Sequence, residues 1–410
     1  MKLFKHQKEL LELNPDKHLL AWGTGSGKTR IAIELADIKG KKTLVICPKS
    51  LTQNWVNEIE KWSTRKNKEL EYLIYSKEVF KKAIKINPDG LSAYKTVIID
   101  EFHYFSNYKS QLTKALLEYI EKSDVEYIYG LTATPYLSTP FNIYTLAKIL
   151  GYNWNWYKFE KAFFNKFKMG NRFIPVVKKN IEKEIARLVN VLGSTVKLED
   201  CFDVPEQTFL TEYFELTPEQ KKGIYELDAI LPIVRINHIQ QISGGYLKKT
   251  EYEGERHFKC EKNSRAIEHI AENKKIAIVC RFNAEIDNLY INIKKKFPKR
   301  NLYKMTGKQS GKERQETIDK IHNDKDSIIL INAAVSEGYS LETIPIMVFY
   351  SMDYSLKSYI QIIGRLLRAS KLKKNIYIFY LMKDKLAVDY QIYDCVVNKK
   401  MDFNDEIYRT

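Results

Sequence analysis

The sequence Gly23-Thr24-Gly25-Ser26-Gly27-Lys28-Thr29 is the most specific signal in this chain of 410 residues. Its small residues let backbone N–H groups point inward around a phosphate, and Lys28 can then reach the outer phosphates of a nucleotide. Thr29 offers a hydroxyl oxygen to Mg²⁺, and the helical segment Arg30–Ile38 adds the positive end of its dipole. The sequence therefore predicts a nucleotide-binding loop with ATP and Mg²⁺ as its ligands.

A second signal is the apolar run Val97-Ile98-Ile99, which ends in Asp100-Glu101-Phe102-His103. Paired carboxylates after a strand suit a magnesium–nucleotide site. Asp100 would bind Mg²⁺ directly or through water, and Glu101 would polarise an attacking water molecule. Taken alone, such a pair is often only the solvated end of a strand. Its position downstream of a glycine-rich phosphate loop favours the catalytic interpretation.

A third signal is Gln361-Ile362-Ile363-Gly364-Arg365-Leu366-Leu367-Arg368. Arg365 and Arg368 lie three positions apart, so they share one face if the segment is helical. Two guanidinium groups that face a γ-phosphate could stabilise transition-state charge as arginine fingers. The alternative interpretation is a basic helix face in contact with solvent.

Short apolar, β-branched runs alternate with helix-period segments in two clusters, roughly residues 20–135 and 270–395. Runs that are apolar on both faces and separated by helices are typical of parallel sheets. The predicted strands are Thr43–Cys47, Tyr72–Tyr75, Thr96–Asp100, Tyr127–Leu131, Ile276–Cys280, Ser327–Asn332, Ile346–Tyr350 and Asn375–Leu381. We therefore expect an α/β fold with two parallel-sheet lobes in tandem.

The stretch between the two clusters lacks this rhythm and is rich in aromatic residues from Trp154 to Phe167. Helix-like segments follow at Ile181–Val191 and Thr217–Ile230, so we expect a helical, aromatic-rich insert. The aromatic cluster is more often a small core than a surface on which bases stack. The predicted domains are residues 1–150, residues 151–265 as insert and linker, and residues 266–410.

Charge and composition narrow the functional classes. The chain has 67 Lys and Arg against 51 Asp and Glu, a net charge of +16, which favours an anionic partner such as nucleic acid. A lysine-rich composition could equally reflect an AT-rich genome. No apolar run approaches the ~18–20 residues of a membrane helix, and the charged start argues against a signal peptide. A cytoplasmic protein is expected, with Cys47 and Cys280 buried as small apolar residues and no zinc or disulfide framework.

The loop GTGSGKT, the carboxylate pair in DEFH and the segment QIIGRLLR, in this order, resemble motifs I, II and VI of superfamily-two helicases. Other segments resemble further motifs of that family, over about residues 4–385. They are Phe4–Gln7 (the adenine-recognition glutamine), Cys47–Leu51 with Asn54-Trp55 (motif Ia), Leu131–Pro135 (motif III), Ile276–Arg281 (motif IV), Met305–Gly307 with Arg314 (the following element) and Asn332–Leu341 (motif V).

Within that superfamily the chain looks most like Swi/Snf-type DNA translocases. The block Pro48–Trp55, the phrase Leu216–Gln220 with Tyr225, and Gly307 with Arg314 carry this likeness. Motif V departs from it, since it reads Ser336-Glu337-Gly338-Tyr339-Ser340-Leu341. His103 also keeps the chemistry of DEAD/DEAH-box enzymes open. The compact form resembles versions found in bacteriophages and mobile elements, so a bacterial or phage-infected cell is the expected setting.

The resemblance implies two RecA-like lobes that bind ATP together and hydrolyse it. In the first lobe it assigns Gln7 to adenine, Lys28, Asp100 and Glu101 to catalysis, and Thr29 and Asp100 to the metal. The residues assigned to the phosphates are Gly23, Thr24, Gly25, Ser26, Gly27, Lys28, Thr29 and Arg30. Coupling residues would be His103, Thr132 and Thr134. The second lobe would supply Glu337, Gly338, Gln361, Arg365 and Arg368.

The expected partner is nucleic acid, with DNA favoured over RNA, bound mostly through its phosphate backbone by a chain that we expect to be monomeric. Candidate contacts are Lys49, Ser50, Thr52, Arg281, Thr306 and Asn332. Such groups carry little sequence information. The leading hypothesis is an ATPase that translocates on or remodels duplex or branched DNA in replication, recombination or repair. The alternatives are an RNA helicase and an ATP-gated DNA-binding subunit of a replication or nuclease complex.

Overall fold

The structure is a computed structural model that describes residues 3–136, 139–169, 172–197, 199–201, 204–227, 231–248, 254–335, 339–367 and 372–400. Packing divides the chain into two compact units, the first made of residues 1–202 and the second of residues 203–401. The three-part division expected from the sequence stays a prediction. Among the residues described, no helix is both long and apolar enough to cross a membrane.

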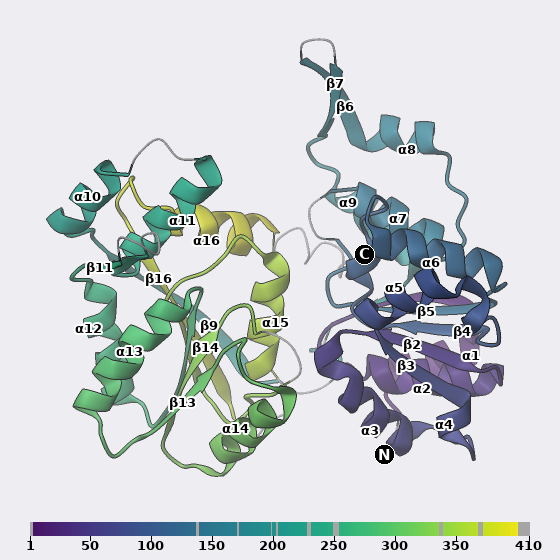
Figure 1. Ribbon diagram of the computed structural model, residues 1–410, viewed down its shortest axis with the longest axis horizontal. Coiled ribbons are helices and arrows are strands. Elements are labelled where there is room, and N and C mark those ends of the chain that lie inside the picture. Colours follow the sequence, from purple (N-terminus) through teal and green to yellow (C-terminus); the bar gives the residue numbers. More distant parts are fainter. Residues whose placement is uncertain are drawn as a thin grey trace. The chain divides into compact units, whose positions relative to one another are not determined.

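The first unit is built on a six-stranded parallel sheet with the order β3-β2-β4-β5-β1-β8 (Figure 1). Its strands are β1 Lys17–Trp22, β2 Thr43–Cys47, β3 Tyr72–Ser76, β4 Thr96–Ile99, β5 Tyr127–Leu131 and β8 Gly193–Val196. Successive side chains of a strand point to opposite faces, so Leu19 and Leu20 enter separate cores. Helices α1 Lys5–Leu13, α2 Lys28–Lys39 and α3 Thr52–Trp62 cover one face. The other is covered by α5 Lys77–Ile86, α6 Gln111–Lys122, α7 Phe141–Ile149 and α9 Glu182–Leu192.

The second unit repeats this architecture with the strand order β13-β14-β12-β15-β16-β9. The strands are β9 Glu206–Phe214, β12 Lys275–Cys280, β13 Asn301–Met305, β14 Ser327–Asn332, β15 Ile346–Phe349 and β16 Lys374–Met382. Its helices are α10 Pro218–Tyr225, α11 Pro232–Ser243, α12 Glu261–Glu272, α13 Asn283–Lys296, α14 Gly311–Asn323, α15 Leu356–Leu366 and α16 Asp389–Tyr393. A short antiparallel ribbon joins β10 Tyr246–Lys248 to β11 Glu255–His257. The prediction of two RecA-like parallel-sheet lobes in tandem is confirmed.

All eight predicted strands are present, but the sequence did not reveal β1, β8, β9 and β13. Strand β8 has the sequence Gly-Ser-Thr-Val, which is too short and polar to stand out as a buried strand. Its first residue is glycine for a steric reason: a Cβ at Gly193 would lie 1.9 Å from the carbonyl oxygen of Leu19 in β1. The expected burial of two cysteines is confirmed, since Cys47 and Cys280 are both almost fully covered.

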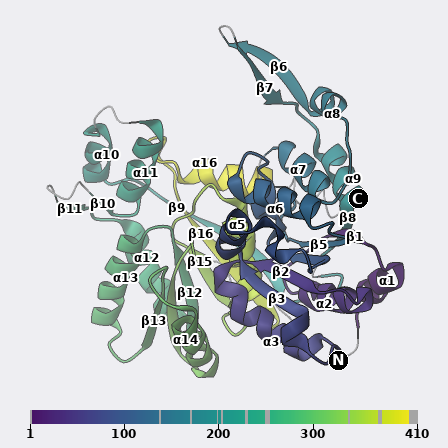
Figure 2. The same cartoon turned by 45° about the vertical axis from the view of Figure 1, so that its right-hand side comes forward.

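The aromatic-rich insert is confirmed, and it contains a β-hairpin in addition to helices. After α7 come α8 Trp156–Phe163, then β6 Phe164–Met169 and β7 Arg172–Val177, and then α9 (Figure 2). Phe159, Phe163 and Phe164 are buried in the core of the first unit. Phe141 stacks on Phe164 with 4.1 Å between ring centroids. Most of the aromatic cluster is therefore a small core, as the sequence favoured.

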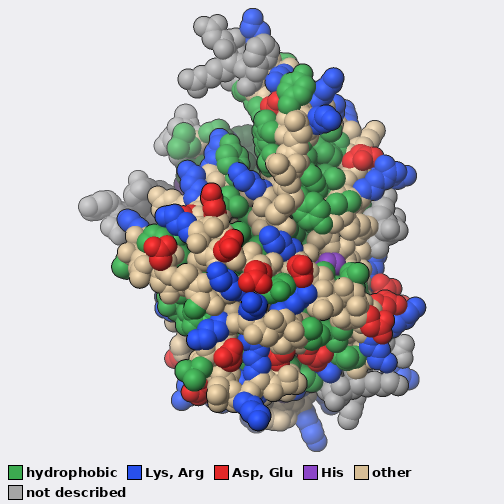
Figure 3. Space-filling view, turned by 90° about the vertical axis from the view of Figure 1, so that its right-hand side faces the viewer, with side chains coloured by type: hydrophobic (Ala, Val, Ile, Leu, Met, Phe, Trp, Pro, Cys, Tyr) green, Lys and Arg blue, Asp and Glu red, His purple; other side chains and the backbone are tan. Residues whose placement is uncertain are grey.

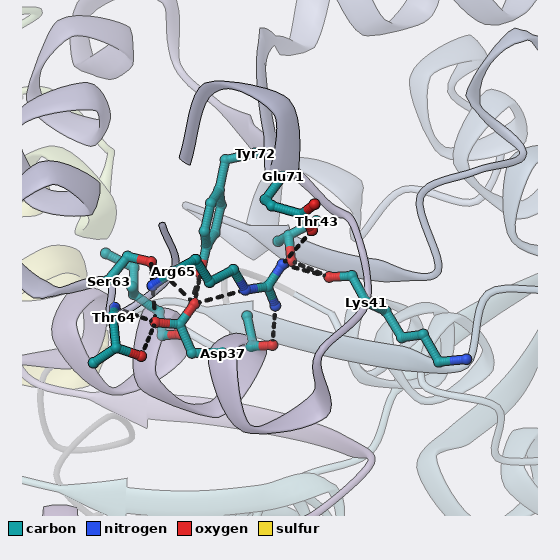
Figure 4. Close-up of polar contacts among 10 residues, drawn as sticks. Asp37, Lys41, Thr43, Ser63, Thr64, Arg65, Glu71 and Tyr72 are labelled. Carbon is teal, nitrogen blue, oxygen red and sulfur yellow. Dashed lines mark hydrogen bonds and ion pairs between the residues drawn. The ribbon is translucent and has the colours of Figure 1, made fainter. Parts of the chain in front are cut away.

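A polar network fixes the C-terminal end of α2, the helix that follows the glycine-rich loop (Figure 4). The Asp37 carboxylate accepts hydrogen bonds from the backbone N–H of Thr64 at 2.7 Å and from the Tyr72 hydroxyl at 2.6 Å. It also forms an ion pair with Arg65, 2.9 Å away, whose guanidinium donates to the Lys41 carbonyl oxygen at 2.7 Å. The network joins α2 to α3, β2 and β3, so it holds the loop helix against the sheet.

The second unit buries titratable groups of its own. Lys262 and Asp389 form an ion pair at 2.5 Å and are almost fully covered. The nearby Glu285 carboxylate is 1% exposed and accepts a hydrogen bond from the Ser351 hydroxyl at 2.5 Å. Burial raises the pKa of Glu285 to about 7, against the lowering effect of the Ser351 bond. This carboxyl group is therefore poised to change charge near neutral pH.

Candidate active site

The residues predicted to bind nucleotide in the first unit lie at one edge of its sheet. The glycine-rich loop follows β1, Asp100 follows β4 and Thr132 follows β5. These strands are parallel and β5 lies between the other two, so all three ends point the same way. Adjacent strands are about 4.8 Å apart, which places the ends of β1 and β4 roughly 10 Å from each other. In open α/β sheets this carboxyl edge is where ligands bind.

The loop itself has the backbone that phosphate binding requires. Gly25 and Gly27 have φ angles of 86° and 84°, a left-handed conformation that only glycine adopts readily. The Lys28 ammonium donates to the carbonyl oxygens of Trp22 at 2.6 Å and Gly23 at 2.8 Å. The Ser26 hydroxyl also donates to Gly23, at 2.7 Å. These contacts hold the lysine inside the loop, at the start of α2.

The remaining loop residues occupy different surroundings. Thr24 lies in the turn, and Thr29 is the second residue of α2, where the first N–H groups of a helix have no intrahelical partner. Arg30, which was predicted to bind nucleotide, forms an ion pair with Glu34 at 2.7 Å and stacks over the Trp62 ring at 4.2 Å. Its role as a phosphate ligand stays a prediction.

Helix α1 braces the loop through two side chains. Gln7 is 1% exposed, and its amide contacts the Ser26 carbonyl oxygen at 3.5 Å. Its other end accepts a hydrogen bond from the Phe4 backbone N–H at 3.0 Å. His6 Nε2 lies 3.1 Å from the same Ser26 oxygen, and burial lowers the pKa of His6, so the neutral ring would donate there. A Cβ at Gly27 would come within 2.2 Å of the Gln7 amide nitrogen, so helix and loop are in close contact.

The Asp100 carboxylate accepts hydrogen bonds from an indole and from a backbone N–H. The Trp55 indole N–H donates to Oδ2 at 2.9 Å, and the Glu101 backbone N–H donates to Oδ1 at 2.9 Å. Trp55 is 1% exposed and belongs to α3, so a rigid aromatic side chain fixes the carboxylate. The sequence showed Trp55 only as part of the motif Ia resemblance. A buried indole N–H usually has a hydrogen-bond partner, so a tryptophan within the motif was the signal for a polar contact there.

Glu101 combines an unusual backbone with a link to the next strand. Its φ is 50°, a left-handed conformation that costs roughly 1–2 kcal/mol for a residue with a side chain. Its carboxylate lies 3.2 Å from His103 Nδ1. That nitrogen is also 3.1 Å from the Thr132 hydroxyl and 3.4 Å from the Thr134 hydroxyl. The three residues predicted to couple the motifs, His103, Thr132 and Thr134, are therefore in direct contact.

The second unit positions Gln361 and Arg365 on α15, both largely buried. Arg365 donates to the Tyr339 carbonyl oxygen at 2.8 Å, and its guanidinium lies 5.1 Å from the centre of the Tyr339 ring. Burial raises the pKa of Tyr339 to about 12, so its phenol stays neutral. Glu337, Gly338 and Arg368 lie outside the described residues. Tyr339 was not predicted as a site residue, although it lies within motif V.

The predicted nucleic-acid contacts also lie at strand ends. In the first unit, Lys49 and Ser50 are exposed just after β2, and the Thr52 hydroxyl donates to the Lys49 carbonyl oxygen at 3.0 Å. In the second unit, Thr306 directly follows β13, Arg281 directly follows β12, and Asn332 is the last residue of β14, which lies between those two strands.

The second-unit contacts are engaged with other groups of the same unit. The Asn332 amide donates to Asn283 at 2.9 Å. Arg281 donates to Asn237 at 2.7 Å and also to Gln240, so its guanidinium holds α11 in place. Its role as a phosphate contact remains a prediction.

The residues at the edge of the first sheet fit a magnesium–nucleoside triphosphate by the chemistry of their donors. The loop has left-handed glycines, a helix N-terminus and an ammonium group, and a fixed carboxylate follows a strand two places away. No cluster of three or more His, Cys, Asp or Glu side chains that could hold a metal occurs within the described ranges. Mg²⁺ in nucleotide sites needs few protein ligands, because phosphates and water supply the others.

Comparison with known proteins identifies two family models along the chain. Residues 1–137 match the model described as the res subunit of type III restriction enzymes, and residues 259–370 match the helicase conserved C-terminal domain. Together the two ranges span more than half of the chain. The chain is also similar to the Sulfolobus solfataricus SWI2/SNF2 ATPase core solved in complex with dsDNA. Identity is 20%, coverage is 100% of this chain and 93% of that chain, and the TM-score is 0.43. No curated protein matches the chain in sequence.

Proposed function

Because this chain belongs to the superfamily-two helicases and is an ATP hydrolase, we propose that it couples ATP hydrolysis to translocation on, or remodelling of, duplex or branched DNA. The activity of the family is driven by nucleic acid, which agrees with the net charge of +16. DNA is favoured over RNA because the Pro48–Trp55 block and the Leu216–Gln220 phrase resemble Swi/Snf-type translocases. Replication, recombination or repair is the proposed setting.

The side chains of the first unit have distinct proposed tasks. Lys28 and the loop N–H groups bind the phosphates, and Asp100, held by Trp55, binds the metal together with Thr29. When bound, Mg²⁺ neutralises part of the phosphate charge. Glu101 orients the attacking water through its carboxylate oxygens. Arg365 and Arg368 from the second unit stabilise the charge that develops on the γ-phosphate.

The observation that carries this proposal is the conformation and the contacts of Glu101. A non-glycine residue with φ of 50° is costly, and such backbone strain is concentrated at functional sites. Its carboxylate is joined through His103 to Thr132 and Thr134 at the end of the neighbouring strand β5. A change at the water-orienting residue would therefore be felt directly by the segment after β5. This gives a physical route by which hydrolysis could be coupled to movement.

The decisive experiment measures ATP turnover with single-stranded DNA, duplex DNA, forked DNA and RNA in parallel. We expect duplex or forked DNA to stimulate turnover most, with steep salt dependence because the contacts are to phosphates. Lys28→Ala and Glu101→Gln should both abolish turnover, while Lys85→Ala, at an exposed position on α5, should not. Turnover that no DNA raises would refute the proposal, and stronger stimulation by RNA would replace DNA with RNA as the track.

A further inference from the structure

The hairpin formed by β6 and β7 projects from the first unit (Figure 1), and Phe164 at the start of β6 is buried in the core of that unit. Every side chain described from Asn165 to Lys168 and from Ile174 to Val177 is exposed. Phe167 is 63% exposed, Val176 is 48% exposed and Ile174 is 41% exposed. An isolated two-stranded ribbon is only marginally stable in water, and it gains nothing by presenting an aromatic ring to solvent. The exposed apolar residues of this hairpin therefore indicate a ligand-binding surface.

The register of the hairpin separates its residues into two faces. Phe167 pairs with Ile174, and Asn165 pairs with Val176, so these four residues share one face. Lys166 pairs with Pro175 and occupies the opposite face together with Lys168. Lys166 contacts Glu160 at 3.2 Å, at the base of the hairpin. The ribbon thus has an apolar face that carries an aromatic ring and a second face that carries lysines.

The charge of the surrounding segment identifies the ligand. From residue 151 to residue 180 the sequence has seven basic residues and a single acidic one, Glu160. The chain as a whole has 67 basic residues against 51 acidic ones, so this segment is far more basic than the average. Figure 3 shows basic and hydrophobic side chains gathered together toward the upper end of this face of the molecule. Such a combination fits a polyanion that also has flat apolar surfaces.

We propose that the β6–β7 hairpin binds single-stranded nucleic acid, with unpaired bases stacked on Phe167 and phosphates contacted by Lys166 and Lys168. Base stacking on aromatic side chains combined with basic groups along the backbone is how proteins hold single strands without sequence preference. Lysine stems are long and flexible, so their ammonium groups reach around the edge of a narrow ribbon to the phosphates. Stacking requires unpaired bases, because the faces of paired bases are covered by their neighbours in the duplex.

The proposal deepens the proposed function, since it rests on a nucleic-acid-driven motor and gives that motor a contact for strands that have left the duplex. A docking site for another protein is the competing occupant. Protein-binding surfaces are depleted in lysine at their centres, whereas this segment is rich in lysine throughout. The chemistry therefore favours nucleic acid.

The test is a binding titration that needs no ATP turnover. Dye-labelled oligothymidine and oligouridine of about 20 nucleotides, which span more than one site of this type, are titrated by fluorescence anisotropy. Phe167→Ala should weaken binding of at least one oligonucleotide about 5- to 150-fold, the range expected for one lost stack. Phe167→Trp should restore it and Phe167→Leu should not, because leucine has apolar area but no ring face. Lys168→Ala should make the salt dependence less steep by about 0.7 in slope.

Two control substitutions lie at exposed positions away from the hairpin: Tyr225→Ala, 72% exposed on α10, and Lys85→Ala on α5. Both should bind like the unmodified chain. Duplex-stimulated ATP turnover should persist in Phe167→Ala, so that failure of the motor and failure of the hairpin are told apart. The inference is overturned if Phe167→Ala binds both oligonucleotides as tightly as Tyr225→Ala does, or if Phe167→Leu restores binding as well as Phe167→Trp.

Discussion

Replacing Trp55 by phenylalanine removes one hydrogen-bond donor from Asp100 and leaves an aromatic ring in the same place. The indole N–H donates to Asp100 Oδ2 at 2.9 Å, and the donor side chain is 1% exposed. After the substitution, Oδ2 loses the indole donor, whereas the bond from the Glu101 backbone N–H to Oδ1 remains. It can then rotate away from the direction in which it would bind Mg²⁺.

The size of the effect follows from the type of bond. A hydrogen bond to a charged group contributes about 1.5–3 kcal/mol, which corresponds to roughly a 10- to 150-fold change in an equilibrium. If the bond serves to hold Asp100 ready for the metal, kcat/KM for magnesium–ATP should fall by at least about tenfold. More Mg²⁺ should also be needed for half-maximal turnover. Loss of part of the indole volume adds a stability cost that does not depend on Mg²⁺.

The assay measures ATP turnover across a magnesium titration at constant free ATP, together with thermal melting. Trp62→Phe is the matched control, because its indole donates at 2.7 Å to Glu58, a carboxylate outside the proposed site. We expect the control to keep the magnesium dependence of the unmodified chain. Equal magnesium dependence in Trp55→Phe and Trp62→Phe would refute the reasoning, even if Trp55→Phe melted at a lower temperature.

Further outcomes follow from the second unit. Arg365→Ala should lower kcat by about 10³-fold or more and leave KM for ATP nearly unchanged, because an arginine finger acts on transition-state charge. Separate measurements of kcat and KM test this, and an unchanged kcat would exclude the role. Burial raises the pKa of Glu285 from 4.5 to about 7. Between pH 4.5 and pH 7 the folded chain therefore binds more protons than the unfolded chain. As a result, Glu285 makes the free energy of unfolding decrease as the pH rises from about 4.5 to 7. Because one pKa unit corresponds to about 1.36 kcal/mol, the free energy of unfolding should decrease by about 3 kcal/mol over this pH range. Glu285→Gln should abolish this decrease. Melting curves at pH 5 and pH 8 test this, and an identical pH response in the variant would contradict it.

Local sequence signals predicted the parts of the fold that depend on local chemistry. Thr43–Cys47 and Tyr127–Leu131 were predicted to the residue, because they are apolar on both faces and bounded by polar turns. Strand β9, Glu206–Phe214, lies at the edge of its sheet and contains polar residues between its apolar ones. The sequence therefore lacks the continuous apolar run of a buried strand, although all nine residues pair with β16. Strand β13, which pairs with β14, was not predicted for a similar reason, because it contains lysine and asparagine.

The candidate site was predictable by residue type and less so by contact. The phosphate loop and the carboxylate pair are continuous in sequence, so a motif is enough to find them. The bond from Trp55 to Asp100 spans 45 positions, and the contact of His6 with Ser26 spans 20. Such contacts depend on how α3 and α1 pack against the sheet, which no local pattern contains. The engagement of Arg281 by Asn237 and Gln240 was hidden for the same reason.

Because β8 lies in the same sheet as β5, the insert between these two strands begins and ends in one sheet. The chain leaves that sheet after β5, runs through the hairpin, and returns beside β1 before it crosses to the second unit. The hairpin could therefore be exchanged for another without altering the crossing. The insert is also connected to the phosphate loop, because the Val196 carbonyl oxygen accepts a hydrogen bond from the N–H of Gly23 at 2.7 Å. A pull on the insert would reach the first glycine of the phosphate loop directly through that peptide-to-peptide bond, in addition to the pairing of β8 with β1.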